Sequence, residues 1–150
     1  MGSKDPASER EALQESAARC KRMRLLLDTS VLIDVLRARN RRSEQLAELV
    51  RAGHTLATTV VNIDELYSGM KQPEQAPAEV FLSSLYCFDL TGTSARLAGK
   101  LKFDWSKKGR TLALVDTTIA ATAIENHCQL FTDNRKDFPM PELSLYPAHV

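Results

Sequence analysis

The sequence predicts an α/β protein in which helices cover both faces of a parallel sheet. Short apolar runs of strand character alternate along the chain with longer segments whose apolar residues recur at helical spacing. Since parallel strands need long crossover connections, the intervening helices are expected to lie over the sheet. The expected strands lie at 23–27, 56–60, 87–90 and 129–132, with 143–146 as a final edge strand.

The composition is that of one globular domain. The chain has 150 residues, of which 43% are apolar and 26% charged, and its formal net charge is +1. No apolar stretch approaches the roughly 20 residues of a membrane span, and residues 1–22 lack the apolar core of a signal peptide. We therefore expect a cytoplasmic protein without a membrane segment. Residues 1–22 are interpreted as an N-terminal extension and 23–150 as the folded domain.

The helices follow from apolar spacing and from capping residues. Apolar positions over 31–36 predict a helix that Asn40 interrupts, and Ser43 is a candidate N-cap for a second helix ending at Gly53. Pro73 and Pro77 mark a loop. The remaining helices are expected over 62–70, over 80–85, from Thr93 or Ser94 to Gly109, and over 117–126.

Acidic residues stand where predicted strands give way to helices. A further polar group follows the strand 129–132. Because the carboxyl ends of parallel strands share one edge of a sheet, these side chains are expected to converge there. The residues are Asp28 after the first strand, Glu65 after the second, Asp116 before 129–132, and then Thr132, Asp133 and Asn134.

Converging carboxylates repel one another unless a cation neutralises them, and a hard divalent ion with oxygen ligands is the natural counter-charge. Mg²⁺ or Mn²⁺ held in this way can activate a water and bind a phosphodiester oxygen. Capping offers another interpretation, in which Asp28 and Asp116 are N-caps and Asn62 with Glu65 forms a capping box. Asp133 and Asn134 could likewise be turn residues. Capping explains each acid separately, whereas their joint position at one edge favours a metal site.

Four segments resemble, in order, the motifs of PIN domains, and specifically of VapC-type toxin ribonucleases. They are 26–33 around Asp28, 59–69 with Glu65 in the acidic position, 114–123 with Asp116, and 130–138. The resemblance covers about residues 23–150. In the last motif the family usually carries Asp or Asn two residues after Thr132, which here is Asn134. Asp133 stands between them, so both remain candidates for the fourth position.

The resemblance implies a PIN-like nuclease domain with an α/β/α sandwich, namely three layers around a mostly parallel sheet of four to five strands. It also implies an acidic pocket that binds Mg²⁺ or Mn²⁺ and endonucleolytic cleavage of RNA. The chain would be the toxin of a toxin–antitoxin pair, a homodimer inhibited by a cognate antitoxin that inserts into the active-site groove. The alternative is a non-catalytic PIN-fold regulator that binds RNA or protein.

The candidate residues then take separate roles. Asp28 and Asp116 are the expected metal ligands, and Glu65 either binds the metal or orients the attacking water. The hydroxyls of Thr29, Ser30 and Thr132 can hydrogen-bond the carboxylates, although Ser30 could also be only an N-cap. The cations that could hold phosphates are Arg37, Arg39, Arg41, Arg42, Lys107, Lys108, Arg110, Arg135 and Lys136, of which Arg110 and Arg135 are the selected substrate-positioning candidates. Trp105 and Tyr67 could stack on bases or serve packing.

Overall fold

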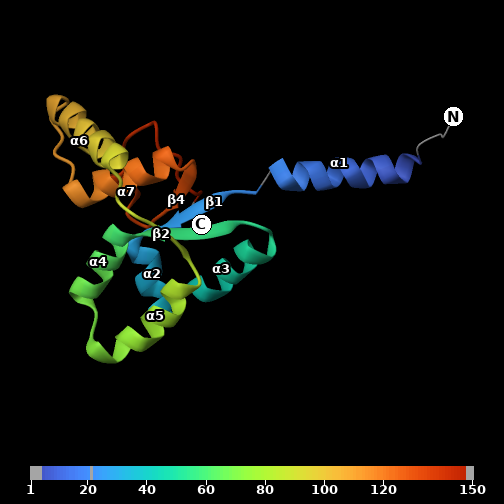
Figure 1. Ribbon diagram of the computed structural model, residues 1–150, viewed down its shortest axis with the longest axis horizontal. Coiled ribbons are helices and arrows are strands. Elements are labelled where there is room, and N and C mark those ends of the chain that lie inside the picture. The colour runs from blue at the N-terminus through green and yellow to red at the C-terminus, as the bar shows by residue number, and fades with distance from the viewer. Residues whose placement is uncertain (1–4, 21, 148–150) are drawn as a thin grey trace.

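A fully parallel, four-stranded sheet lies at the centre of the protein (Figure 1). The computed structural model describes residues 5–20 and 22–147, and the side chains of residues 14–20 lie outside that description. Helices lie on both faces of the sheet, so the predicted three-layer α/β/α class is confirmed. The strands are β1 (Arg24–Leu27), β2 (Thr55–Thr59), β3 (Tyr86–Phe88) and β4 (Cys128–Phe131), in the spatial order β3-β2-β1-β4.

The helices divide between the two faces of this sheet. In Figure 1, α6 and α7 lie on one side, while α2, α3 and α5 lie on the other. The α-helices are α1 (Pro6–Cys20), α2 (Thr29–Leu36), α3 (Arg42–Arg51), α4 (Val60–Gly69), α5 (Gln75–Ser83), α6 (Gly92–Lys107) and α7 (Leu114–Glu125). Two short 3₁₀ helices, η1 (Gln72–Glu74) and η2 (Arg135–Asp137), complete the chain order.

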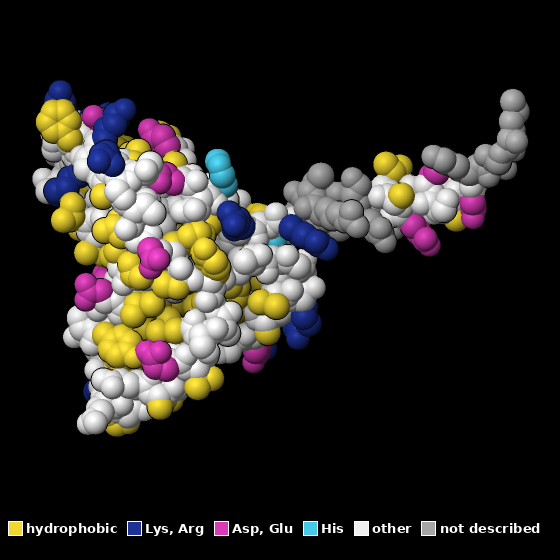
Figure 2. Space-filling view, viewed as in Figure 1, with side chains coloured by type: hydrophobic (Ala, Val, Ile, Leu, Met, Phe, Trp, Pro, Cys, Tyr) yellow, Lys and Arg dark blue, Asp and Glu magenta, His cyan; other side chains and the backbone are white. Residues whose placement is uncertain are grey.

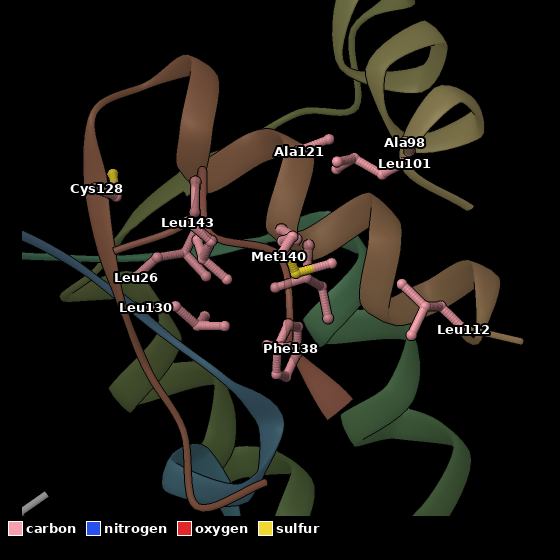
Figure 3. Close-up of a cluster of buried hydrophobic side chains, with 13 residues drawn as sticks. Leu26, Ala98, Leu101, Leu112, Ala121, Cys128, Leu130, Phe138, Met140 and Leu143 are labelled. Carbon is pink, nitrogen blue, oxygen red and sulfur yellow. The ribbon is translucent and has the colours of Figure 1, made fainter. Parts of the chain in front are cut away.

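Strand β1 is buried on both faces and separates two apolar clusters. Leu25 and Leu27 belong to the cluster under α2 and α3, whereas Leu26 belongs to the cluster under α6 and α7. All three leucines are fully buried, as the period-two alternation of strand side chains requires for a covered sheet. Figure 3 shows the second cluster, in which Leu26 and Leu130 lie near each other below Leu143.

The strand register brings the ends of β1 and β4 side by side. Leu27 pairs with Phe131, and the next amide, that of Asp28, donates to the carbonyl of Phe131 at 2.9 Å. Asp28 and Thr132 are therefore the first residues after two neighbouring strands, and they lie side by side at the carboxyl edge of the sheet. Thr59 ends β2, the other neighbour of β1, at this carboxyl edge.

Two predicted helix starts are wrong by a few residues. Thr59, and not Asn62, is the N-cap of α4, and its hydroxyl accepts the Asn62 amide at 3.1 Å. Likewise Thr91 caps α6 by accepting the Ser94 amide at 3.0 Å. In both cases a threonine three residues earlier, at the end of an extended segment, captures the free amide first.

The turn between α2 and α3 has an unusual backbone. Ala38, Asn40 and Arg41 have φ values of 51°, 55° and 52°, in the left-handed region that non-glycine residues rarely adopt. Helix α3 begins at Arg42 directly after this turn, so the predicted N-cap Ser43 lies inside the helix. Because such a backbone costs free energy, the turn indicates that the position of the following residue, Arg42, matters to the fold.

The predicted final edge strand is reduced to a single bridge. Leu145 forms an isolated parallel bridge with Leu130, the Leu130 amide donates to the Ser144 carbonyl at 2.9 Å, and the Tyr146 amide donates to the Leu130 carbonyl at 2.8 Å. The segment therefore covers the free side of β4 without forming a fifth strand.

The N-terminal extension contains α1, which Figure 1 shows apart from the sheet and its flanking helices. Residues 1–4 and Lys21 of the extension, and residues 148–150 of the expected domain, lie outside the described residues. The boundary between an N-terminal extension (1–22) and the folded domain (23–150) stays a prediction. Among the helices that the structure describes, none combines the length and apolarity needed to cross a membrane.

Candidate active site

Asp28 is held by hydrogen bonds from two other segments. Its side chain is 5% exposed, and its Oδ2 accepts the Thr132 hydroxyl at 2.6 Å while its Oδ1 accepts Nδ2 of Asn62 at 3.2 Å. Asp28 occupies the N-cap position of α2, yet its carboxylate makes no capping hydrogen bond. Asp28 is therefore the N-cap residue by position, as the capping interpretation predicted, while its carboxylate oxygens accept hydrogen bonds from Thr132 and Asn62.

A buried amide links Asp28 to Glu65. The Asn62 side chain is fully buried, accepts the Thr59 hydroxyl at 2.7 Å, and donates to the Thr29 hydroxyl at 3.1 Å as well as to Asp28. Thr29 in turn donates to Oε1 of Glu65 at 2.8 Å. This network replaces the predicted Asn62–Glu65 capping box.

Sequence reasoning had not assigned Asn62 to the site. One signal could have found it, since Asn62 stands three residues before Glu65 and the two side chains lie on one face of a helix. Its burial and its four hydrogen bonds define it as the residue that orients the Asp28 side of the site.

Asp116 lies in the first turn of α7, whose N-cap is Ala113, so its predicted capping role is wrong. Burial, followed by the negative charges of Asp137, Asp28 and Glu65, raises the pKa of Asp116 to about 6. Among the described residues, no hydrogen bond to its carboxylate offsets this effect. The three predicted acids thus come together electrostatically at one edge of the sheet.

Asp137 is an acid of the site that was not predicted. It is exposed at the end of η2, and its charge raises the pKa of Asp116 more than that of Asp28 or Glu65 does. Burial also raises the pKa of Asp28, against the hydrogen bond from Thr132, with a smaller contribution from Asp137. The signal was available in the closing motif, where Asp137 stands three residues after Asn134 and one 3₁₀ turn brings it back toward the strand end.

The two candidates for the fourth position have different surroundings. The Asp133 carboxylate forms an ion pair with Arg42, and the Asp133 amide donates to the Ser30 hydroxyl at 3.3 Å. The Asn134 amide donates to the Thr132 hydroxyl at 3.0 Å. Ser30 therefore contacts the backbone of the closing loop rather than a carboxylate, and the Asp133 side chain is directed toward α3.

Arg42 fixes this loop to the helix layer. Its Nε donates to Oδ2 of the buried Asp34 at 3.0 Å, and its guanidinium lies 5.0 Å from the ring centroid of Phe131. The Arg42 and Asp34 side chains are 12% and 11% exposed. Because the guanidinium donates to Asp34, Asp133 and Gln45, Arg42 contributes to the position of the loop.

The two selected substrate-positioning arginines also make backbone contacts. Nη1 of Arg135 donates to the Tyr146 carbonyl at 2.8 Å, and Nη2 of Arg110 donates to the Lys136 carbonyl. These contacts fix the closing loop from two sides. A role of either arginine toward substrate stays a prediction.

The acidic residues suit a hard cation by donor type and by charge. They supply oxygen ligands, and their mutual repulsion is what a divalent ion would relieve. Within the described residues, however, no three His, Cys, Asp or Glu side chains form a ready-made metal-binding group. Both oxygens of Asp28 and one of Glu65 are engaged in hydrogen bonds instead. The ligand set is therefore chemically suited but not preformed.

Comparison with known sequences identifies the family. The model of the PIN domain matches residues 25–140. Ribonuclease VapC19 of Mycobacterium tuberculosis is 35% identical over 119 residues, which cover 79% of this chain and 95% of the relative. Ribonuclease VapC2 of Rickettsia felis is 27% identical over 126 residues, covering 80% and 94%.

Solved structures show the same fold. The VapBC2 complex of Rickettsia felis, bound to a DNA fragment from its promoter, matches with a TM-score of 0.74 and 27% identity over 83% of this chain and 98% of that one. VapBC-1 of nontypeable Haemophilus influenzae matches with a TM-score of 0.70 and 22% identity over 83% and 97%, which bears on the fold alone.

A parallel sheet with acidic side chains gathered at its carboxyl edge defines the class to which the molecule belongs. The chain is a member of the PIN-domain family. Its similarity to the VapC-type members, predicted from four motifs, is confirmed by the curated relatives and by the structural neighbours.

Proposed function

We propose that the protein is a Mg²⁺- or Mn²⁺-dependent endoribonuclease and the toxin of a VapBC-type toxin–antitoxin pair. The observation that carries the proposal is the gathering of Asp28, Glu65 and Asp116, from three separate segments of the chain, close enough for two of them to raise the pKa of the third. Such a cluster suits divalent-metal phosphodiester chemistry. The similarity to proteins named Ribonuclease VapC supports RNA as the substrate.

The roles follow from the surroundings of each acid. Asp28 and Asp116 would hold the ion, and Glu65 would bind it or orient the attacking water. A bound divalent ion supplies positive charge and lowers the pKa of a water. The hydroxyls of Thr132 and Thr29 restrict the rotamers of Asp28 and Glu65, which reduces the reorganisation needed to receive the ion.

A cognate antitoxin is the proposed protein partner. The structural neighbours include toxin–antitoxin complexes. The chain also carries an open apolar groove of about 410 Å³ between α2, α3 and α5, whose lining includes Val35, Leu46, Val50 and Phe81. Exposed apolar surface of this kind is typical of an interaction site. The predicted homodimer remains part of the proposal, and sedimentation of the purified protein would measure it.

Cleavage of RNA by the purified protein tests the enzymatic proposal. With Mg²⁺ or Mn²⁺ we expect endonucleolytic products that disappear in EDTA, and we expect Asp28→Asn and Asp116→Asn each to reduce the rate by about 100-fold or more. Asp64→Asn is the matched control, because Asp64 is exposed on α4 next to Glu65. Activity retained in both site variants would refute the assignment.

The alternative is a non-catalytic PIN-fold regulator that binds RNA or protein. The described residues contain no closed group of metal ligands. Titration calorimetry separates the two functions, since the enzyme should bind Mn²⁺ in an Asp116-dependent manner at neutral pH. Heat identical for wild type and Asp116→Asn would favour the regulator.

A further inference from the structure

The structure divides the basic residues of the chain into engaged and available groups. Of the four arginines between residues 37 and 42, all but Arg39 form ion pairs within the described residues. Arg37 pairs with Glu74 at 3.4 Å, Arg41 pairs with Glu44 at 2.7 Å, and Arg42 pairs with Asp34 and Asp133. The first predicted group of phosphate-binding cations is therefore largely neutralised by neighbouring carboxylates.

The end of α6 and the turn after it differ. Between residues 100 and 110 the sequence carries five cations and one acid, Asp104. Lys107, Lys108 and Arg110 are exposed, and none of them takes part in an ion pair within the described residues. This segment therefore presents a net positive charge that no ion pair among the described residues neutralises.

Aromatic rings stand among these cations. Phe103 is 58% exposed and belongs to neither apolar cluster, and Nζ of Lys107 lies 4.5 Å from its ring centroid. Nζ of Lys108 lies 4.4 Å from the ring of Trp105, which packs against the core. Figure 2 shows Lys and Arg side chains gathered around hydrophobic ones at the α6 end of the molecule, at the upper left. We call Phe103, Lys107, Lys108 and Arg110 the α6 ridge.

The ridge is attached to the acidic site by its own contacts. Arg110 donates to the carbonyl of Lys136, the residue before Asp137. Nζ of Lys102 donates to the carbonyl of Leu112, two residues before α7 begins. The segment that carries the ridge is thus fixed against both η2 and the start of α7, which carries Asp116.

We propose that the α6 ridge binds the single-stranded part of an RNA substrate next to the phosphodiester that is cleaved. This inference rests on the proposed function and adds the surface that holds the substrate. Lysine and arginine contacts to phosphates release counterions, and an exposed ring can stack on a base of any identity. The carboxylate cluster repels the RNA backbone, so affinity has to come from cationic surface beside it.

Salt-dependent binding measures the phosphate contacts. The full chain carrying Asp116→Asn, to prevent cleavage, is titrated into a fluorescein-labelled single-stranded RNA of mixed sequence at several NaCl concentrations. Adding Lys107→Gln and Lys108→Gln should weaken binding about tenfold at low salt and reduce the slope of log K against log[salt] by about 1.4. Arg37→Gln with Arg41→Gln is the matched control, which removes the same charge from paired positions and should leave the slope unchanged.

The aromatic contact is measured in the same way. Phe103→Ala should weaken binding about tenfold without changing the salt slope, because stacking releases no counterions. In an otherwise wild-type chain, the lysine variant should raise KM for long RNA and leave kcat unchanged. Thermal unfolding checks that each variant is folded.

Three results would overturn the inference. One is a lysine variant whose slope and affinity equal those of the Arg37/Arg41 control. Another is a Phe103→Ala variant that binds RNA normally but changes the sedimentation of the protein, which would make the ridge a contact between two copies. The third is KM unchanged in the lysine variant. If wild type binds RNA through the α6 ridge but cleaves no RNA with Mg²⁺ or Mn²⁺, the proposed enzymatic function is refuted and RNA binding by the ridge is retained.

Discussion

Asp28 and Asp116 face the same site in contrasting surroundings. Asp28 receives hydrogen bonds from Thr132 and Asn62, and both partners are themselves buried in a network. Asp116 has no such donor among the described residues, and its neighbours are acids. Hydrogen bonds therefore partly offset the rise in pKa that burial causes at Asp28, whereas the carboxylate of Asp116 has no such compensation among the described residues.

The contrast indicates how the site divides its tasks. A carboxylate that is already hydrogen-bonded keeps its rotamer, so Asp28 provides a fixed point in the site. Asp116, whose pKa is raised to about 6, would be stabilised most by an added cation. A bound metal ion would therefore change the protonation of Asp116 more than that of Asp28. Four substitutions test this division, in order of decreasing expected effect.

The largest effect is expected for Arg42→Gln, on the Asp28 side. The substitution leaves the buried Asp34 without its ion-pair partner and frees the loop that carries Thr132. We expect a loss of about 3 kcal/mol in the free energy of unfolding, measured by urea denaturation. Arg41→Gln, in an exposed pair with Glu44, should change it by less than about 1 kcal/mol. Equal losses in the two variants would show that Arg42 does not hold the loop that carries Thr132.

Thr132→Val should have an intermediate effect confined to the same side. It keeps the shape of the side chain but removes the donor to Asp28, and should cost about 1–2 kcal/mol at pH 7. The pKa of Asp28 should rise further, as observed by carboxyl NMR titration, while that of Asp116 changes little. Thr122→Val, whose hydroxyl donates only to a carbonyl of α7, is the control.

The raised pKa of Asp116 should make the free energy of unfolding depend on pH. The pKa of Asp116 is raised in the folded state from 3.8 to about 6, so the folded state binds more protons than the unfolded state between these values. Stability in EDTA should therefore contain a contribution that is present below about pH 4 and is lost as the pH rises through about 6. Asp116→Asn should remove about 1 kcal/mol of this dependence, allowing for partial solvent screening. Parallel profiles for wild type and variant would contradict the assigned pKa.

Asp137→Asn is expected to produce the smallest change. Removing this charge should lower the pKa of Asp116 and, to a smaller degree, that of Asp28, because Asp137 is the largest charged contributor at Asp116. Carboxyl NMR titration in EDTA measures both values. Asp64→Asn serves as the control and should change the pKa of neither carboxyl. A change in the pKa of Asp28 alone would contradict the assigned effect of Asp137 on Asp116.

Much of this arrangement was predictable from local pattern. The apolar run ending at Asp28 predicted both the strand and its acidic end, and the alternation of elements predicted the parallel sheet. The placement of Asp28, Glu65 and Asp116 at one edge then followed from topology. Helix starts were less accurate, because Thr59 and Thr91 compete for the same free amides as the residues after them.

The partners of each acid could not be predicted in the same way. The contact of Arg42 with Asp133 spans 91 positions, and it depends on a left-handed turn of three non-glycine residues that no local propensity favours. The burial of Asn62 likewise depends on the packing of α4 against α2. Asp137 lies six residues after the end of β4 in the sequence, and only the 3₁₀ turn of η2 brings it back to the site.

The pairing of β1 with β4 also has a consequence for biosynthesis. Asp28 and its donor Thr132 are separated by 104 positions. At about 5–20 residues per second, a ribosome adds Thr132 about 5–20 s after Asp28. Throughout that interval the emerging polypeptide holds the first acid without the strand that orients it. The acidic edge of the sheet can therefore assemble only late in translation, when β4 docks beside β1.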